Sequence, residues 1–112
     1  MAKGDYLGDL EQLILTAVLL LGENAYGMTI HEKVEELAEG FRDVSLGSAY
    51  TTLERLEQKG YIKSWFADPT PERGGKAKKY FEITASGQTV LKNSLKVATN
   101  MVRGLREIGG LV

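Results

Sequence analysis

The sequence has 112 residues, of which 43% are hydrophobic and 26% charged, a size and composition that fit one globular domain. It contains no cysteine, which excludes a disulfide framework, a thiolate zinc site and a cysteine nucleophile. Its net charge of −1 is small, and no apolar run approaches the roughly 20 residues of a membrane-spanning helix. Because the first residues also lack the pattern of a signal peptide, we expect a cytoplasmic protein without a membrane partner.

The charge is unevenly distributed along the chain. Residues 1–40 hold two basic and eight acidic residues, a net of −6, whereas residues 41–80 carry +3 and residues 81–112 carry +2. Such asymmetry says more about possible partners than the total charge does. The basic remainder of the chain is therefore compatible with an anionic partner.

Two amphipathic helices are predicted in the first third of the sequence. Residues 7–21 place apolar side chains at steps of three and four, and the turn residues 22–24 end this segment. A second helix is predicted from Gly27 to Ala38, with apolar and charged side chains on opposite faces. His31, the only histidine, lies on this charged helix, where a surface role is favoured over catalysis or metal binding.

The third predicted helix carries two different stripes of side chains. Ser45 can cap its first turn, and Gly60 ends it. The apolar stripe, which we expect to be buried, consists of Leu46, Ala49, Tyr50, Leu53 and Leu56. The polar stripe contains hydroxyls and cations without a carboxylate, and consists of Ser48, Thr51, Thr52, Arg55 and Lys59. Taken alone, the polar stripe fits a solvated face as well as it fits a contact surface for an anionic partner.

A β-hairpin is predicted after the third helix. Residues 61–66 and 77–83 are aromatic and β-branched in character, and the segment between them contains two prolines and two glycines. Four cations cluster on the tip and the return arm of this hairpin: Arg73, Lys76, Lys78 and Lys79. Beside a helix with a polar face, these cations favour contact with phosphates.

The last predicted helix is longer than a small three-helix core requires. It begins after Thr84, a suitable N-cap, and continues to about Ile108, a length of roughly 37 Å. Its apolar face consists of Leu91, Leu95, Ala98, Met101, Val102, Leu105 and Ile108. Because this face extends beyond the core, we expect it to pair with a second copy of the chain in a homodimer.

Three helices, a hairpin and a long helix predict a mainly α fold with a small β-hairpin (α+β), the winged helix-turn-helix. We expect a DNA-binding domain over residues 1–83 and a dimerisation helix over residues 84–112, together forming one compact unit. A helix with a polar face fits the major groove of DNA, and a basic hairpin can reach the DNA backbone beside that groove. The predicted contacts with double-stranded DNA are Ser45, Ser48, Tyr50, Thr51, Thr52, Arg55, Lys59, Arg73, Lys76, Lys78 and Lys79. Tyr50 is included because its hydroxyl can reach a phosphate at the edge of the helix, although its place in the apolar stripe favours packing in the core.

Three segments carry a family resemblance. The run from Val44 to Ile62, VSLGSAYTTLERLEQKGYI, closely resembles the recognition helix of PadR-like regulators. Tyr26-Gly27 resembles the turn before the family's second helix, and residues 75–87 resemble its wing return. The resemblance spans about residues 7–108. It implies a bacterial, dimeric, repressor-like transcription regulator whose DNA binding is relieved by a small-molecule effector.

The resemblance also directs attention to an effector site. Family members with one short C-terminal helix include drug-responsive regulators with a pore at the dimer interface, in the best known of which a tryptophan stacks flat ligands. The matching position here is Ala98, and the only tryptophan is Trp65 on the first wing strand. For Trp65, packing in the hairpin or at an interface is favoured over a role as a ligand platform. The candidate effector pocket therefore comprises Trp65, Ala98 and Met101.

Other functions are less well supported by the residues. One histidine and no ligand-spaced cluster leave no nucleophile–base pair or metal site, so we expect neither catalysis nor a cofactor. The alternative to a DNA-binding dimer is a protein-interaction module that retains the winged-helix fold without binding DNA. The acidic N-terminal third gives this alternative some weight.

Overall fold

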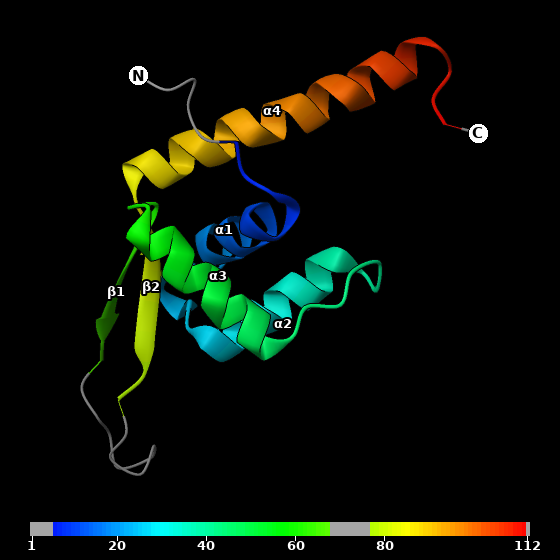
Figure 1. The fold of residues 1–112 in the computed structure, drawn as a ribbon. Helices are drawn as coiled ribbons and strands as arrows, with labels where there is room; N and C mark the ends of the chain where they lie inside the picture. Colours follow the sequence, from blue (N-terminus) through cyan, green and yellow to red (C-terminus); the bar gives the residue numbers. More distant parts are fainter. Residues whose placement is uncertain (1–5, 68–76, 112) are drawn as a thin grey trace.

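The computed structural model describes residues 6–67 and 77–111, which form four α-helices, a short 3₁₀ turn and a two-stranded antiparallel sheet (Figure 1). In chain order the elements are α1 (Asp9–Leu21), η1 (Gly22–Asn24), α2 (Gly27–Ala38), α3 (Leu46–Gln58), β1 (Ile62–Phe66), β2 (Lys79–Ile83) and α4 (Ala85–Glu107). This order confirms the predicted winged helix-turn-helix with a long last helix. Within the described ranges, no helix combines the length and apolar character needed to cross a bilayer.

The core is built around α1, which contacts α2, α3, α4 and β2. In Figure 1, α4 runs along one side of α1 while α2 and α3 lie on the other. Ile14, Leu15 and Val18 of α1 are buried, together with Ile30 of α2 and Leu53 of α3. Because α1 is covered from several directions, it connects the two helices of the helix-turn-helix to α4.

The turn between α2 and α3 is held by a hydrogen bond within the first turn of α3 and by a contact from α2. Glu39, in the left-handed conformation at φ 50°, ends α2, and the chain then reverses toward Ser45. The Ser45 Oγ accepts a hydrogen bond from the Ser48 N–H at 3.0 Å, which confirms the predicted N-cap of α3. The His31 ring lies 2.7 Å from the Val44 carbonyl oxygen, measured from Nε2. His31, on α2, therefore contacts the end of the turn and is not a purely surface residue.

The two strands of the wing are anchored to the segment before α2. β1 and β2 pair antiparallel, with Trp65 opposite Tyr80. The backbone of Tyr26 forms a further bridge with Tyr80, and the Phe81 N–H donates to the Ala25 carbonyl at 2.9 Å. The base of the wing is thus attached to the start of α2. The predicted second strand was two residues too long, because pairing begins at Lys79.

α4 is buried along its first half only. The Thr84 Oγ1 accepts a hydrogen bond from the Gly87 N–H at 3.1 Å, which confirms the predicted N-cap. Val90, Leu91 and Ser94 are buried, whereas no residue of α4 after Ser94 is. In Figure 1 the second half of α4 extends past the rest of the chain. The apolar side chains of that half are therefore exposed or only partly covered by the described residues.

Candidate nucleic-acid interface

The face of α3 that points away from the core is the centre of the candidate interface. Ala49, Leu53 and Leu56 are buried, as predicted. Successive helical residues turn by about 100°, so the opposite side of α3 is formed by side chains one to three turns apart. That outward face comprises Gly47, Thr51, Glu54 and Gln58, flanked by Ser48 and Arg55 on one side and Tyr50 on the other, all exposed. It offers hydroxyl, amide and guanidinium groups to a groove.

Three positions on α3 differ from the predicted stripes. Thr52 is only 3% exposed and faces the core, so its place in the polar stripe was wrong and it is closed to a duplex. Leu46 and Tyr50, predicted to be buried, are 37% and 46% exposed. The apolar period fixes which residues share a stripe, but contact with α1 and α2 decides which sector of α3 is covered. Here the covered sector includes Thr52 instead of Tyr50.

The outward face also contains two polar residues that the sequence pattern did not select. Glu54 lies on it, so the face is not free of carboxylates. Gln58, one turn beyond Glu54, is exposed as well. An amide of this kind can form two hydrogen bonds with an adenine edge. A helical wheel that takes the outward face as the side opposite Leu56 would have included both Glu54 and Gln58.

The hydroxyl groups at the start of α3 bond with one another and with the backbone. The Ser45 Oγ donates to the Ser48 Oγ at 3.0 Å, and the Thr51 Oγ1 donates to the Gly47 carbonyl at 3.0 Å. Both serines and Thr51 remain exposed, and each hydroxyl oxygen has lone pairs left. The start of α3 therefore presents an ordered group of hydroxyls.

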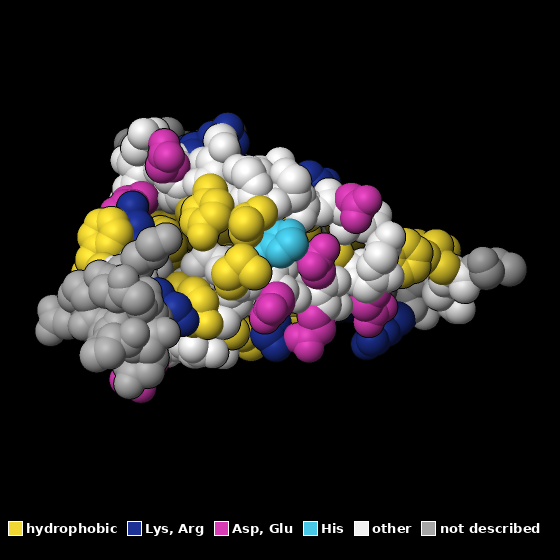
Figure 2. Space-filling model, turned by 90° about the horizontal axis from the view of Figure 1, so that it is seen from below, with side chains coloured by type: hydrophobic (Ala, Val, Ile, Leu, Met, Phe, Trp, Pro, Cys, Tyr) yellow, Lys and Arg dark blue, Asp and Glu magenta, His cyan; other side chains and the backbone are white. Residues whose placement is uncertain are grey.

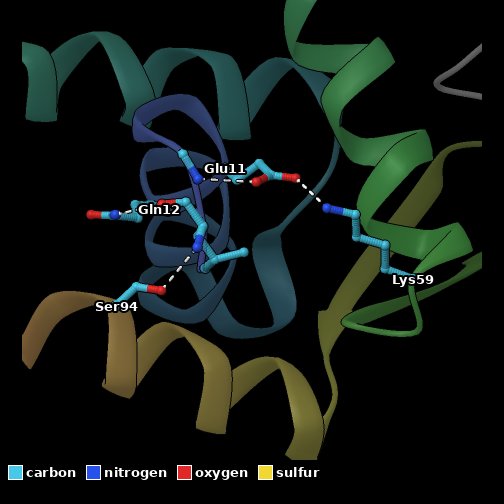
Figure 3. Close-up of polar contacts among 6 residues, drawn as sticks. Glu11, Gln12, Lys59 and Ser94 are labelled. Atoms are coloured by element: carbon cyan, nitrogen blue, oxygen red, sulfur yellow. Dashed lines mark hydrogen bonds and ion pairs between the residues drawn. The ribbon is translucent and has the colours of Figure 1, made fainter. Parts of the chain in front are cut away.

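Lys59, predicted to belong to the DNA-contacting stripe, is engaged with α1. Its Nζ lies 3.1 Å from the Glu11 Oε2, a contact that joins the end of α3 to the first turn of α1 (Figure 3). The Glu11 side chain is only 13% exposed, whereas the Lys59 side chain is 37% exposed, so the ion pair is shielded mainly on the Glu11 side. The structure thus gives the Lys59 ammonium a partner within the chain.

Two of the four predicted wing cations lie within the described residues. The Lys78 Nζ sits 3.9 Å above the centre of the Tyr26 ring, which places it beside the start of α2. The Lys79 Nζ is 3.9 Å from a Glu57 carboxylate oxygen at the end of α3. Both therefore lie where the wing meets the helix-turn-helix. Arg73 and Lys76 lie outside the described residues.

The neighbouring surface of α2 has the opposite charge. Glu32, Glu35, Glu36 and Glu39 are all exposed. Figure 2, a view of the molecule from below, shows acidic side chains gathered on one part of the face and hydrophobic side chains uncovered beside them. Since an acidic surface repels anions, the wing side of α3 is the more favourable side for an anionic partner.

The three residues of the candidate effector pocket do not line one hollow in the single chain. Trp65 borders a hollow of about 460 Å³ between the wing, the end of α1 and the start of α4, where it meets Leu19 and Gln88. Ala98 borders a separate hollow along α4, whereas Met101 borders neither. Within the described residues, Trp65 and Ala98 thus belong to different surfaces.

Comparison with known proteins gives a consistent picture. The model of the family described as "Transcriptional regulator PadR-like family" matches residues 16–93. A PadR family transcription regulator from Clostridium difficile has a TM-score of 0.72 at 24% identity, with 92% of this chain and 100% of that chain covered. A PadR-like transcriptional regulator from Bacillus cereus has a TM-score of 0.69 at 25% identity, with 88% of this chain and 89% of that chain covered.

A third solved structure contains nucleic acid. Bacillus subtilis PadR in complex with operator DNA has a TM-score of 0.65 at 24% identity. The similarity covers 77% of this chain and 46% of that chain, so this chain spans less than half of that protein's length. A search of curated proteins found no match.

Proposed function

The chain belongs to the PadR-like family of DNA-binding transcriptional regulators, which are not enzymes, and on this premise we propose that it is a homodimeric repressor. The observation that carries the proposal is the exposed polar face of α3 beside a wing base that holds two cations. The operator DNA bound to Bacillus subtilis PadR supports it. A regulator of transcription works at the chromosome, in keeping with the expected cytoplasmic location.

In the proposed complex, α3 lies in the major groove. Arg55 contacts guanine or a phosphate, and Gln58 contacts adenine, the base edges that suit these side chains. Ser48 and Thr51 bond with base edges or phosphates on the same exposed face. Ser45 and Tyr50, at the margin of that face, bind backbone phosphates. Thr52 is left out of the contact set because it is buried, and Lys59 because Glu11 holds it.

The wing supplies contacts that do not depend on sequence. Lys78 and Lys79 bind phosphates beside the groove that receives α3, joined by Arg73 and Lys76, whose positions remain predictions from the sequence. Such contacts release counterions from the DNA, so they raise affinity most at low salt. The wing therefore adds affinity, while α3 adds selectivity.

The second half of α4, after Ser94, supports the proposed dimer. Its exposed or half-exposed apolar residues include Leu95, Ala98, Met101, Val102, Leu105 and Ile108, and we propose that these six pack against a second copy. Leu91, predicted to lie at this interface, is instead buried in the chain's own core. Because the first half of α4 belongs to that core, residues 1–83 and 84–112 are proposed to move as one unit.

An effector site is proposed on the dimer rather than on the single chain. Ala98, with Leu95 and Val102, borders a hollow along α4 that a second copy would help to enclose. Met101 follows on the same half of the helix. Trp65 lies beside a different hollow, so it is a separate candidate. An effector bound along α4 would release DNA by changing how the two copies sit together.

The experiment that tests the proposal is a binding measurement with the protein's own promoter region. At low salt, fluorescence anisotropy should show tighter binding to this fragment than to an unrelated duplex of equal length. Transcription from the same promoter in vitro should fall when the protein is added. Absence of binding to every fragment would overturn the proposal and favour the protein-interaction module, for which the exposed glutamates of α2 offer a surface.

A further inference from the structure

The end of α3 is joined directly to the start of α4. The Thr84 Oγ1 and the Ser86 Oγ both donate hydrogen bonds to the Gly60 carbonyl, at 2.7 and 3.1 Å. Gly87 lies so close to the Tyr61 carbonyl that a Cβ at this position would overlap it. This contact fixes one point of α4 relative to the segment that ends α3.

A second connection leads to α4 through the first turn of α1 (Figure 3). The Ser94 Oγ accepts a hydrogen bond from the Leu7 N–H at 3.1 Å. One residue further on, the Gly8 N–H donates to the Glu11 Oε1 at 3.1 Å. The other oxygen of Glu11 holds Lys59, the residue that follows α3. A continuous series of polar contacts therefore runs from Ser94 to Lys59, and we call it the junction.

The junction is shielded from solvent at its Ser94 end, whereas its Lys59 end lies nearer the surface. Ser94 is 1% exposed, and Leu7, which donates the hydrogen bond to Ser94, is fully buried. The Gln12 amide also donates to the Leu7 carbonyl at 2.8 Å, which fixes the same turn from the other side. A buried hydrogen bond such as that between Leu7 and Ser94 is stronger than one on an open surface, where water competes for both groups. The junction is therefore suited to hold a geometry.

The two connections are well separated along α4. Ser94 follows Thr84 by ten residues, which is about 15 Å along a helix. A rod attached at one point can pivot, whereas a rod attached at two distant points has a fixed direction. The direct contact at Gly60 supplies the first point, and the junction supplies the second.

We propose that Glu11, Lys59 and Ser94 are positioning residues that fix the angle between α3 and α4 and so determine which half-site spacing the dimer accepts. This inference rests on the proposed function, because it needs a dimer that binds two half-sites. In a two-fold dimer, a change of this angle moves both recognition helices. One added base pair turns a half-site by about 35° around the duplex, so a rigid dimer rejects it.

The test compares duplexes that differ only in the spacer between half-sites. An operator is first selected from random duplexes with the wild-type protein, and variants with one base pair added or removed are then made. The wild type should lose about tenfold in affinity for a wrong spacer, equivalent to 1.4 kcal/mol. The double variant Glu11→Ala/Ser94→Ala should lose less than about threefold. Its discrimination against a base change inside a half-site should stay as in the wild type.

Controls separate this role from a general loss of stability. Glu36→Ala removes an exposed carboxylate that pairs with Lys33 at 2.6 Å, and it should leave the spacer preference unchanged. Should the double variant fail to fold, Glu11→Gln removes the charge with little change of shape. Circular dichroism and thermal melting establish that each variant is folded. A folded variant that keeps the wild-type ratio between spacers would overturn the inference.

Lys59 distinguishes the junction from a direct DNA contact. If the junction is correct, Lys59→Met and Glu11→Ala both flatten the spacer preference. If Lys59 instead binds phosphate, Lys59→Met weakens binding at every spacer and lowers the salt dependence, while Glu11→Ala does not. A wild type that binds no DNA refutes the proposed function, whereas one that binds DNA without a spacer preference refutes only this inference.

Discussion

The phenol ring of Tyr50 on α3 rests directly on the backbone of Gly27 at the start of α2. A Cβ at position 27 would overlap the hydroxyl oxygen and two ring carbons of Tyr50, so this contact requires glycine. Gly27 is buried, while Tyr50 is half exposed at the margin of the face proposed to meet DNA. The contact therefore couples the spacing of α2 and α3 to the position of a candidate phosphate-binding hydroxyl.

Gly27→Ala should destabilise the protein by about 1–3 kcal/mol, because the added methyl group must push Tyr50 or α2 aside. Chemical denaturation gives the free energy of unfolding. Gly47→Ala is the matched control, since a Cβ there meets only the Ser45 Oγ at 4.0 Å and alanine favours a helix. Equal stability of the two variants would show that Tyr50 moves without penalty.

Arg55→Ala and Gln58→Ala should each weaken operator binding by about 1–3 kcal/mol per half-site, because each removes a side chain proposed to read a base. Anisotropy titrations with operators that carry single base changes would show whether preference is lost at one position only. Lys96→Ala removes an exposed cation from α4 and serves as the control for charge. If Arg55→Ala instead lowers the affinity for all sequences equally, Arg55 contacts phosphates and not a base.

Lys78→Ala/Lys79→Ala should weaken binding to every duplex. The slope of log K against log salt concentration should fall by about 3.6, because the dimer loses four phosphate contacts and each contributes about 0.9. The measurement is a set of titrations at several salt concentrations. Lys92→Ala/Lys96→Ala removes two exposed cations from α4 and should leave the slope unchanged. An unchanged slope in the wing variant would exclude these lysines from phosphate contact.

Val102→Asp should convert the dimer to a monomer, because it places a charge on the exposed apolar side of α4. Light scattering at micromolar concentration reports the mass, and operator affinity should fall with it. Asn100→Asp adds the same charge on the opposite side of α4 and should leave the dimer intact. A wild-type monomer under these conditions would contradict the proposed assembly.

The elements and their caps could be read from the sequence because they depend on local chemistry. Ser45 and Thr84 cap α3 and α4 as predicted, each accepting a hydrogen bond from a backbone N–H three residues later. The direction in which each stripe of α3 faces depends on its neighbours in space. Thr52 was therefore misplaced, and Gln58 was missed.

Contacts between distant segments were beyond sequence reasoning. Glu11 and Lys59 are 48 residues apart, and the sequence around either residue does not predict contact with the other. The same holds for His31 and Val44, because a contact between a ring and a backbone carbonyl cannot be predicted from the periodicity of side chains. These contacts changed the roles of Lys59 and His31 without changing the predicted fold.

The exposed half of α4 links the fraction of dimeric protein to the concentration of the chain. A helical stretch as short as residues 95–107 is only marginally stable in water by itself. In the proposed dimer, the second copy supplies the missing stability, so folding of this stretch and assembly become one event. When the cell makes more of the protein, both the number of chains and the fraction in the dimeric form rise. Repression would then respond to dosage more steeply than in proportion.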